Sequence, residues 1–279
     1  KDEAATTQPV TAIMIENSPD ARPQSGLKQA GIVYEAIAEG GITRFLALYH
    51  EAKPQLIGPV RSVREYYVDW LTPYNASVAH VGGSAQALSM VRNGSYRDID
   101  QFFNAGSYWR ATDRYAPHNV YTSFDKLDAL NKAKGYTSSK FTGWPRQDGK
   151  PSSGPNATSI DINFSSALFN THYDYDAATN TYKRSEGGQA HNDREEGQLA
   201  PNVVVAMHVD MQLVLQDGYR EQITAIGSGK ATVFQNGTAT DVTWHKADRG
   251  SQIEFTDADS KPIKFNRGQT WIAATPNQG

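Results

Sequence analysis

The chain contains no cysteine among its 279 residues. Disulfide bridges, thiolate metal sites and cysteine nucleophiles are therefore excluded. The chain also has no apolar run near the roughly 20 residues that a membrane-spanning helix needs, and no signal-peptide core. Its first residue is Lys1 rather than methionine, which indicates a trimmed or processed chain from which a targeting segment could have been removed.

Neither sign of charge dominates the sequence. The formal net charge is -3, and 38% of the residues are hydrophobic while 20% are charged. This balance is typical of an ordered globular protein, and it lacks the basic stripe of a nucleic-acid-binding protein. We therefore expect no nucleic-acid partner. The length allows one large domain or two of ordinary size.

A stretch rich in glycine, proline, serine and lysine divides the sequence. It covers residues 139–157, has few apolar positions, and is interpreted as a linker. The N-terminal part, residues 10–138, mixes strand and helix patterns, whereas residues 158–279 contain mostly short strands separated by turns. The expected fold class is α+β, with an N-terminal α/β part and a mostly antiparallel, β-rich C-terminal part.

Within the N-terminal part, a predicted hairpin precedes a predicted helix. Residues 32–39 and 43–51 are strands joined at Gly40-Gly41. Ser62 and Glu65 fit a capping box at the start of the helix. The apolar positions recur at the spacing of one helix face. These positions are Val63, Tyr66, Tyr67, Trp70 and Leu71.

Arginines lie where the helix dipole disfavours them. Arg61 and Arg64 precede or begin the predicted helix, at its positive end, so an anion or a carboxylate is needed as counter-charge. Arginine suits carboxylate and phosphate, and several converging arginines would form an anion-binding cleft. The candidates are Arg22, Arg44, Arg61, Arg64, Arg110 and Arg114. Internal pairing with Glu16, Glu35, Glu39, Glu65 and Asp113 explains the same residues equally well.

Acid-base chemistry is a second possibility. Glu16 ends a predicted strand, and Asp113 and His118 lie in a dense polar and aromatic segment. A histidine with a carboxylate is the minimum for such chemistry, but no spacing here is diagnostic. His80 is expected to be a hydrogen-bonded core residue, and Ser84 a helix N-cap rather than a nucleophile. The acidic segment 182–203 could bind a hard cation, although a solvated hairpin explains it better, and we predict no metal site.

Longer motifs carry a resemblance to a known family. They include IMIENSPDARPQSGL, IVYEAIAEGGITRFLALY, GPVRSVREYYVDW, AHVGGSAQAL and YWRATDRYAPHNVYTS. Together they resemble the YerB-like bacterial lipoproteins of the DUF3048 family, over nearly the whole chain. The resemblance implies a layered β-β-α sandwich. It also implies a Gram-positive cell-envelope protein, tethered by a lipid to the outer face of the cytoplasmic membrane. The family offers no catalytic mechanism to carry over.

These observations favour a non-enzymatic envelope binding or scaffold protein. We expect no cofactor, assign no catalytic residue, and consider an anionic small molecule, a cell-wall component or envelope proteins as partners. The alternative is an envelope hydrolase or transferase that acts on wall material through Glu16 with Asp113 or His118. The proposed ligand-binding set is Glu16, Arg22, Glu39, Arg44, Arg61, Arg64, Arg110, Asp113, Arg114 and His118.

Overall fold

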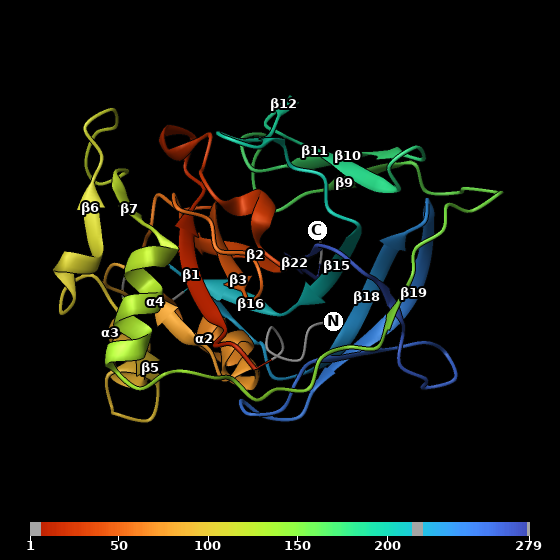
Figure 1. The fold of residues 1–279 in the computed structure, drawn as a ribbon. Coiled ribbons are helices and arrows are strands. Elements are labelled where there is room, and N and C mark those ends of the chain that lie inside the picture. Colours follow the sequence, from red (N-terminus) through yellow and green to blue (C-terminus); the bar gives the residue numbers. More distant parts are fainter. Residues whose placement is uncertain (1–6, 214–219, 278–279) are drawn as a thin grey trace.

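The computed structural model describes residues 7–213 and 220–277. Ten strands form one large sheet. They are β1 (Thr11–Glu16), β2 (Ile32–Glu39), β3 (Ile42–Tyr49), β4 (Ser77–Ala79), β5 (Arg97–Asp98), β15 (Val203–Val209), β18 (Gly227–Gln235), β19 (Thr238–Lys246), β20 (Glu254–Thr256) and β22 (Thr270–Pro276). Their order is β20-β19-β18-β15-β22-β2-β3-β1-β4-β5 (Figure 1). Both parts of the sequence therefore contribute to one sheet.

The remaining strands form smaller units. Four of them make an antiparallel sheet: β9 (Ser159–Ile162), β10 (Thr171–Asp176), β11 (Thr181–Glu186) and β12 (Gln189–Ala190). The others pair in twos: β6 (Tyr108–Arg110) with β7 (Val120–Thr122), β8 (Arg146–Gln147) with β21 (Phe265–Asn266), β13 (Asn192–Asp193) with β14 (Gly197–Gln198), and β16 (Met211–Leu213) with β17 (Glu221–Ile223). The fold is α+β with mostly antiparallel pairing, which confirms the predicted class.

Among the described residues, three α-helices and four short 3₁₀ turns complete the fold. They are α2 (Glu65–Leu71), α3 (Ala85–Val91), α4 (Phe124–Ala133), η1 (Pro19–Ala21), η2 (Leu27–Gln29), η3 (Thr72–Tyr74) and η4 (Ala105–Ser107). Helices α2 and α3 share a core with one face of β1–β3, while α4 and the four-stranded sheet share cores with the opposite face. The layers are thus helix, large sheet and small sheet.

Local sequence signals account for several boundaries. The β2–β3 hairpin turns at Gly40 and Gly41, whose φ values of 57° and 76° suit a two-residue turn that matches strand twist. Ser84 accepts a hydrogen bond from the backbone N–H of Ala87 and caps α3, as predicted. The predicted capping box at Ser62 is wrong. Helix α2 starts at Glu65 with Arg64 as its N-cap, because the Ser62 hydroxyl donates instead to the carbonyl of Val81.

The two parts of the sequence meet along β22. This strand pairs in parallel with β15 on one side and with β2 on the other. The predicted linker also enters the core, since Trp144 is buried and its indole N–H donates to the carbonyl of Ile253 at 2.8 Å. The division at residues 139–157 stays a prediction from sequence, but the structure packs this segment against both parts.

A buried ionic cluster joins the small sheet to the large one. Arg184, on β11, is fully buried, and its Nη2 lies 3.0 Å from both oxygens of Glu35 on β2. The same nitrogen lies 3.6 Å from Oε1 of Glu186. Its guanidinium also stacks on Trp271, 4.4 Å from the ring centroid. The Arg184 guanidinium therefore bridges carboxyl groups from the two sheets.

Replacing Arg184 with methionine should strongly destabilise the protein. The change leaves the buried Glu35 without its cation and Glu186 with Arg22 alone, and breaking a buried pair in this way costs ~3–5 kcal/mol. Urea unfolding followed by circular dichroism measures the loss. Lys183→Met is the matched control, because Lys183 is the exposed neighbour on the same strand and should show no measurable loss. Equal stability of both variants would contradict the role given to Arg184.

Candidate functional site

The carboxyl ends of three parallel strands meet at one edge of the large sheet. Strand β1 pairs in parallel with β4, and β4 pairs in parallel with β5. Polar residues follow at these ends: Glu16 on β1, His80 after β4 and Asp98 on β5. Ligands of open sheets bind outside the carboxyl ends of parallel strands. The carboxyl ends of these strands therefore form a candidate ligand site.

Glu16 and His118 form a carboxylate–imidazole pair at this edge. Oε1 of Glu16 lies 2.6 Å from Nδ1 of His118, and the two residues are 102 positions apart in the chain. The Ser18 hydroxyl donates to Oε1 of Glu16 at 3.0 Å and lies 3.3 Å from the same Nδ1. A catalytic triad would place the hydroxyl and the carboxylate on different ring nitrogens. Ser18 is therefore no triad nucleophile.

Arg61 lies beside this pair and is incompletely bonded. Its Nε is 3.8 Å from Oε2 of Glu16, and its side chain is 24% exposed. Its backbone is held between strands, because its N–H donates to Met14 and its carbonyl accepts from Val81. Within the part of the chain that the structure describes, the Arg61 guanidinium donates no hydrogen bond, and Oε2 of Glu16 accepts none. The Arg61 guanidinium can therefore still donate hydrogen bonds, and Oε2 of Glu16 can still accept one.

Glu39, Arg44 and Arg64 form a separate, closed group. Both arginines pair with Glu39, and each donates a further hydrogen bond to a backbone carbonyl. Burial alone would raise the pKa of Glu39, but the two cations outweigh it and hold the pKa below its ordinary value. The carboxylate of Glu39 thus supplies the counter-charge that Arg64 needs at the start of α2.

Strand β6 and the segment that joins it to β7 carry three more residues of the proposed set, Arg110, Asp113 and Arg114. Asp113 pairs with Arg194 at 2.6 Å, and Arg110 donates to the side-chain oxygen of Asn119 at 2.8 Å. Arg114 donates to backbone carbonyls of the Asp20–Pro23 loop. The structure therefore brings His118, and not Asp113, to Glu16. The arginines in this segment attach the loop that carries His118.

Arg22 belongs to the buried ionic cluster. Its Nε donates to Asn17 at 3.2 Å, and its Nη2 lies 3.4 Å from Glu186. Burial lowers the pKa of Arg22, and the two glutamates of the cluster oppose that shift. By their hydrogen bonds and ion pairs, the ten proposed residues fall into four groups.

Sequence reasoning missed Arg184 and Glu186, and it misread the segment that follows them. The interpretation of residues 182–203 as a solvated hairpin is wrong, since His191 and Asp193 are 3% and 1% exposed. The signal that could have found the cluster is the alternation along β11, where Tyr182, Arg184 and Glu186 all face inward. Charged residues at buried positions of an alternating strand indicate an internal partner.

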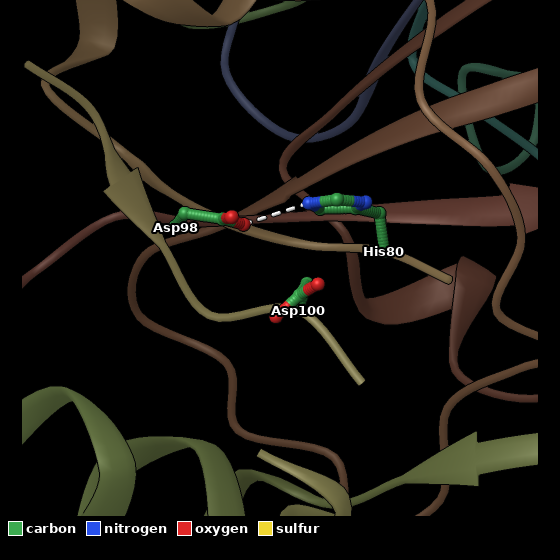
Figure 2. Close-up of side chains that lie close together, drawn as sticks. All are labelled: His80, Asp98 and Asp100. Carbon is green, nitrogen blue, oxygen red and sulfur yellow. Dashed lines mark hydrogen bonds and ion pairs between the residues drawn. The ribbon is translucent and has the colours of Figure 1, made fainter. Parts of the chain in front are cut away.

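A possible metal centre lies among His80, Asp98 and Asp100, whose ligand atoms are within 4.8 Å of one another (Figure 2). Both ring nitrogens of His80 are engaged at 2.7 Å, one by the carbonyl of Gly82 and one by Asp98. Asp100 accepts from Arg92 at 3.0 Å and from a backbone N–H at 3.2 Å. His80 is a hydrogen-bonded core residue, as predicted. These bonds use the ligand atoms that a metal would need.

Nearly the whole chain matches proteins of one known family. Residues 1–137 match the N-terminal domain, and residues 160–272 the C-terminal domain, of a family described as "Protein of unknown function (DUF3048)". The candidate lipoprotein YerB of Bacillus subtilis (strain 168) is 32% identical over 99% of this chain and 84% of its own length. The crystal structure of YerB from the same organism matches with a TM-score of 0.88 and 33% identity, covering 99% of this chain and 93% of that one.

The buried cluster should give the protein a characteristic pH dependence. Burial raises the pKa of Glu186 to about 7, despite the opposing charge of Arg184, from an ordinary value of 4.5. The folded state thus keeps a proton that the unfolded chain releases. This contribution is complete below pH 4.5 and is lost as the pH rises through about 7. Burial also keeps the pKa of His191 well below 6.5, so its contribution is lost as the pH falls below 6.5.

Glu186→Gln isolates the first effect. The stability difference between the unchanged protein and this variant should decline by about 1 kcal/mol per pH unit between pH 5 and 7. Urea unfolding at several pH values from 5 to 8 measures it. Glu254→Gln, an exposed change on β20, is the control and should give a constant difference. A constant difference for Glu186→Gln as well would refute the raised pKa.

Proposed function

Since this chain belongs to the DUF3048 family, whose function is not known, we propose that it is an extracytoplasmic lipoprotein of a Gram-positive-type bacterial envelope that binds an anionic ligand. Its relative YerB is named as a candidate lipoprotein, which supports the lipid anchor. Across residues 7–213 and 220–277, no helix is long and apolar enough to cross a bilayer. The ligand would be a small molecule or cell-wall component that carries a carboxylate or phosphate group.

The observation that carries this proposal is the state of Arg61. The five other arginines of the proposed set all donate hydrogen bonds inside the protein, whereas Arg61 donates none among the described residues. An arginine has five N–H donors in a planar fork, which suits an external carboxylate or phosphate. His118 and Ser18 bond to Oε1 of Glu16, and Oε2 lies 3.8 Å from Nε of Arg61, which is beyond hydrogen-bond distance.

The surroundings of Arg61 also favour binding at an edge. It lies just before α2 and beside the β4–α3 turn, and its side chain is 24% exposed. His118 presents its second ring nitrogen near the exposed carboxylate of Asp20, 3.9 Å away, so this nitrogen lies toward solvent. A bound anion would therefore contact Arg61 first and His118 second. The proposed ligand-binding set thereby narrows to Glu16, Arg61 and His118.

Arg61→Gln should weaken this binding. Inorganic phosphate at constant ionic strength serves as the probe, because a ligand that binds only the folded state raises the melting temperature. The variant should need at least about tenfold more phosphate for the same shift, the loss expected for a charge-assisted hydrogen bond. Arg249→Gln removes an equally long, exposed arginine that pairs with Asp69, and should respond like the unchanged protein. An unaltered response of Arg61→Gln would eliminate the site.

The enzymatic alternative keeps one specific observation in its favour, the 2.6 Å contact between Glu16 and His118. A carboxylate that fixes one ring nitrogen leaves the other to act as a general acid or base. Arg61 would then orient the substrate. The reaction class would be hydrolysis or group transfer on wall glycan, peptide or phosphate ester.

Release of soluble fragments from purified cell wall tests this alternative. An enzyme of this kind should lose about 100-fold or more of its rate in both Glu16→Gln and His118→Asn, the usual contribution of a general acid or base. Circular dichroism melting confirms that both variants fold. If the unchanged protein releases no fragments, the catalytic reading fails and the binding proposal stands alone.

A further inference from the structure

A cavity of about 730 Å³ lies at the opposite end of the large sheet. It includes Val10, which precedes β1, and residues 49–52, which end and follow β3. Strand β1 runs six residues from this end to Glu16, which is ~20 Å in an extended chain. The lining also includes residues of the 139–157 segment and of the turn before β22. All three segments of the sequence therefore build this cavity, and it shares no residue with the Arg61 site.

Aromatic side chains form one wall of the cavity. Tyr74, Phe141 and Trp144 all line it, and the ring centroids of Tyr74 and Phe141 are 5.7 Å apart. Trp144 is fixed by the hydrogen bond to Ile253 and by edge contacts with Phe255 and Phe265. Small-molecule sites of this size are usually lined by such rings with a few placed polar groups. A flat apolar group fits this wall.

Arg146 supplies the placed polar group. Its Nη1 donates to the carbonyl of Asn266 at 3.2 Å and to Thr270 at 3.1 Å, and its guanidinium stacks near Trp144 at 5.7 Å. No carboxylate among the described residues pairs with it, and its Nε and Nη2 have no partner there. Burial lowers the pKa of Arg146. A partly buried arginine held in place by neutral groups lacks the counter-charge that such a position normally requires.

We propose that this cavity binds a small organic acid whose flat apolar body lies against Tyr74, Phe141 and Trp144 and whose carboxylate or phosphate pairs with Arg146. Lys28, Arg267 and one carboxylate, Glu51, also line the cavity, and Arg267 pairs with Asp148. Arg146 and Lys28 are therefore the cations that favour an acidic ligand. The planar guanidinium can offer its two unused nitrogens to one acid group. The site stands apart from the Arg61 site, so either can fail alone.

Two fluorescent probes distinguish binding to the aromatic wall from pairing of an acid group with Arg146. The first is 8-anilinonaphthalene-1-sulfonate, and the second is N-phenyl-1-naphthylamine, which has the same rings without the anion. In the unchanged 279-residue chain both should bind. Arg146→Gln should weaken the anionic probe by about tenfold and leave the neutral probe within about twofold. Phe141→Ala, at a side chain that is 36% exposed, should weaken both probes.

Arg249→Gln, which changes an arginine outside the cavity, is the matched control and should leave the affinity for both probes unchanged. Melting curves check that each variant is folded. Displacement of the anionic probe by 1-naphthoate and by 1-naphthyl phosphate then distinguishes a carboxylate from a phosphate preference. The proposal is overturned if the folded, unchanged protein binds neither probe. Equal affinity of Arg146→Gln and the unchanged protein for the anionic probe overturns it as well.

Discussion

The ion cluster around Arg184 constrains the rest of this structure. A fully buried guanidinium is tolerated only when its carboxylates, hydrogen-bond acceptors and stacking partners are all in place. Glu35 comes from the large sheet and Glu186 from the small one, so the cluster is complete only when the two sheets dock in one arrangement. Apolar contacts alone would allow small slips between the layers, whereas displaced charges would be left buried and unpaired.

Docking the layers in one arrangement has consequences at both ends of β1. Asn17, just beyond its carboxyl end, bonds to Glu186 in the cluster, and the adjacent Glu16 points instead to His118 and Arg61. At the other end, the N-terminal strands, the 139–157 segment and the turn before β22 enclose the cavity with Arg146. Rigid strands thus position loop residues, which is how binding sites are commonly built on layered folds.

The arginines of this protein differ in the hydrogen bonds and ion pairs that they make. Arg44 and Arg64 share Glu39, and Arg114 holds a loop through backbone carbonyls. In each of these three arginines both terminal nitrogens donate hydrogen bonds inside the protein, and only Nε has no partner among the described residues. Arg61 and Arg146 differ in their terminal nitrogens, because among the described residues neither Nη of Arg61 donates a hydrogen bond and Arg146 donates only from Nη1. That contrast points to two anion sites of different character, one polar and open at a sheet edge, the other lined by aromatic rings.

The sequence by itself determined the α+β class, the β2–β3 hairpin, the buried face of α2 and the cap at Ser84, since all of these depend on neighbours a few residues away. It also singled out Glu16, Arg61 and His118, though only as members of a larger set. Their separation from the seven other residues was decided by the tertiary structure, as were the burial of Arg184 and the cavity at Arg146. Those features depend on contacts between residues more than 100 positions apart, such as Glu16 with His118 and Arg184 with Glu35. Local pattern carries no information about which distant carboxylate satisfies which arginine.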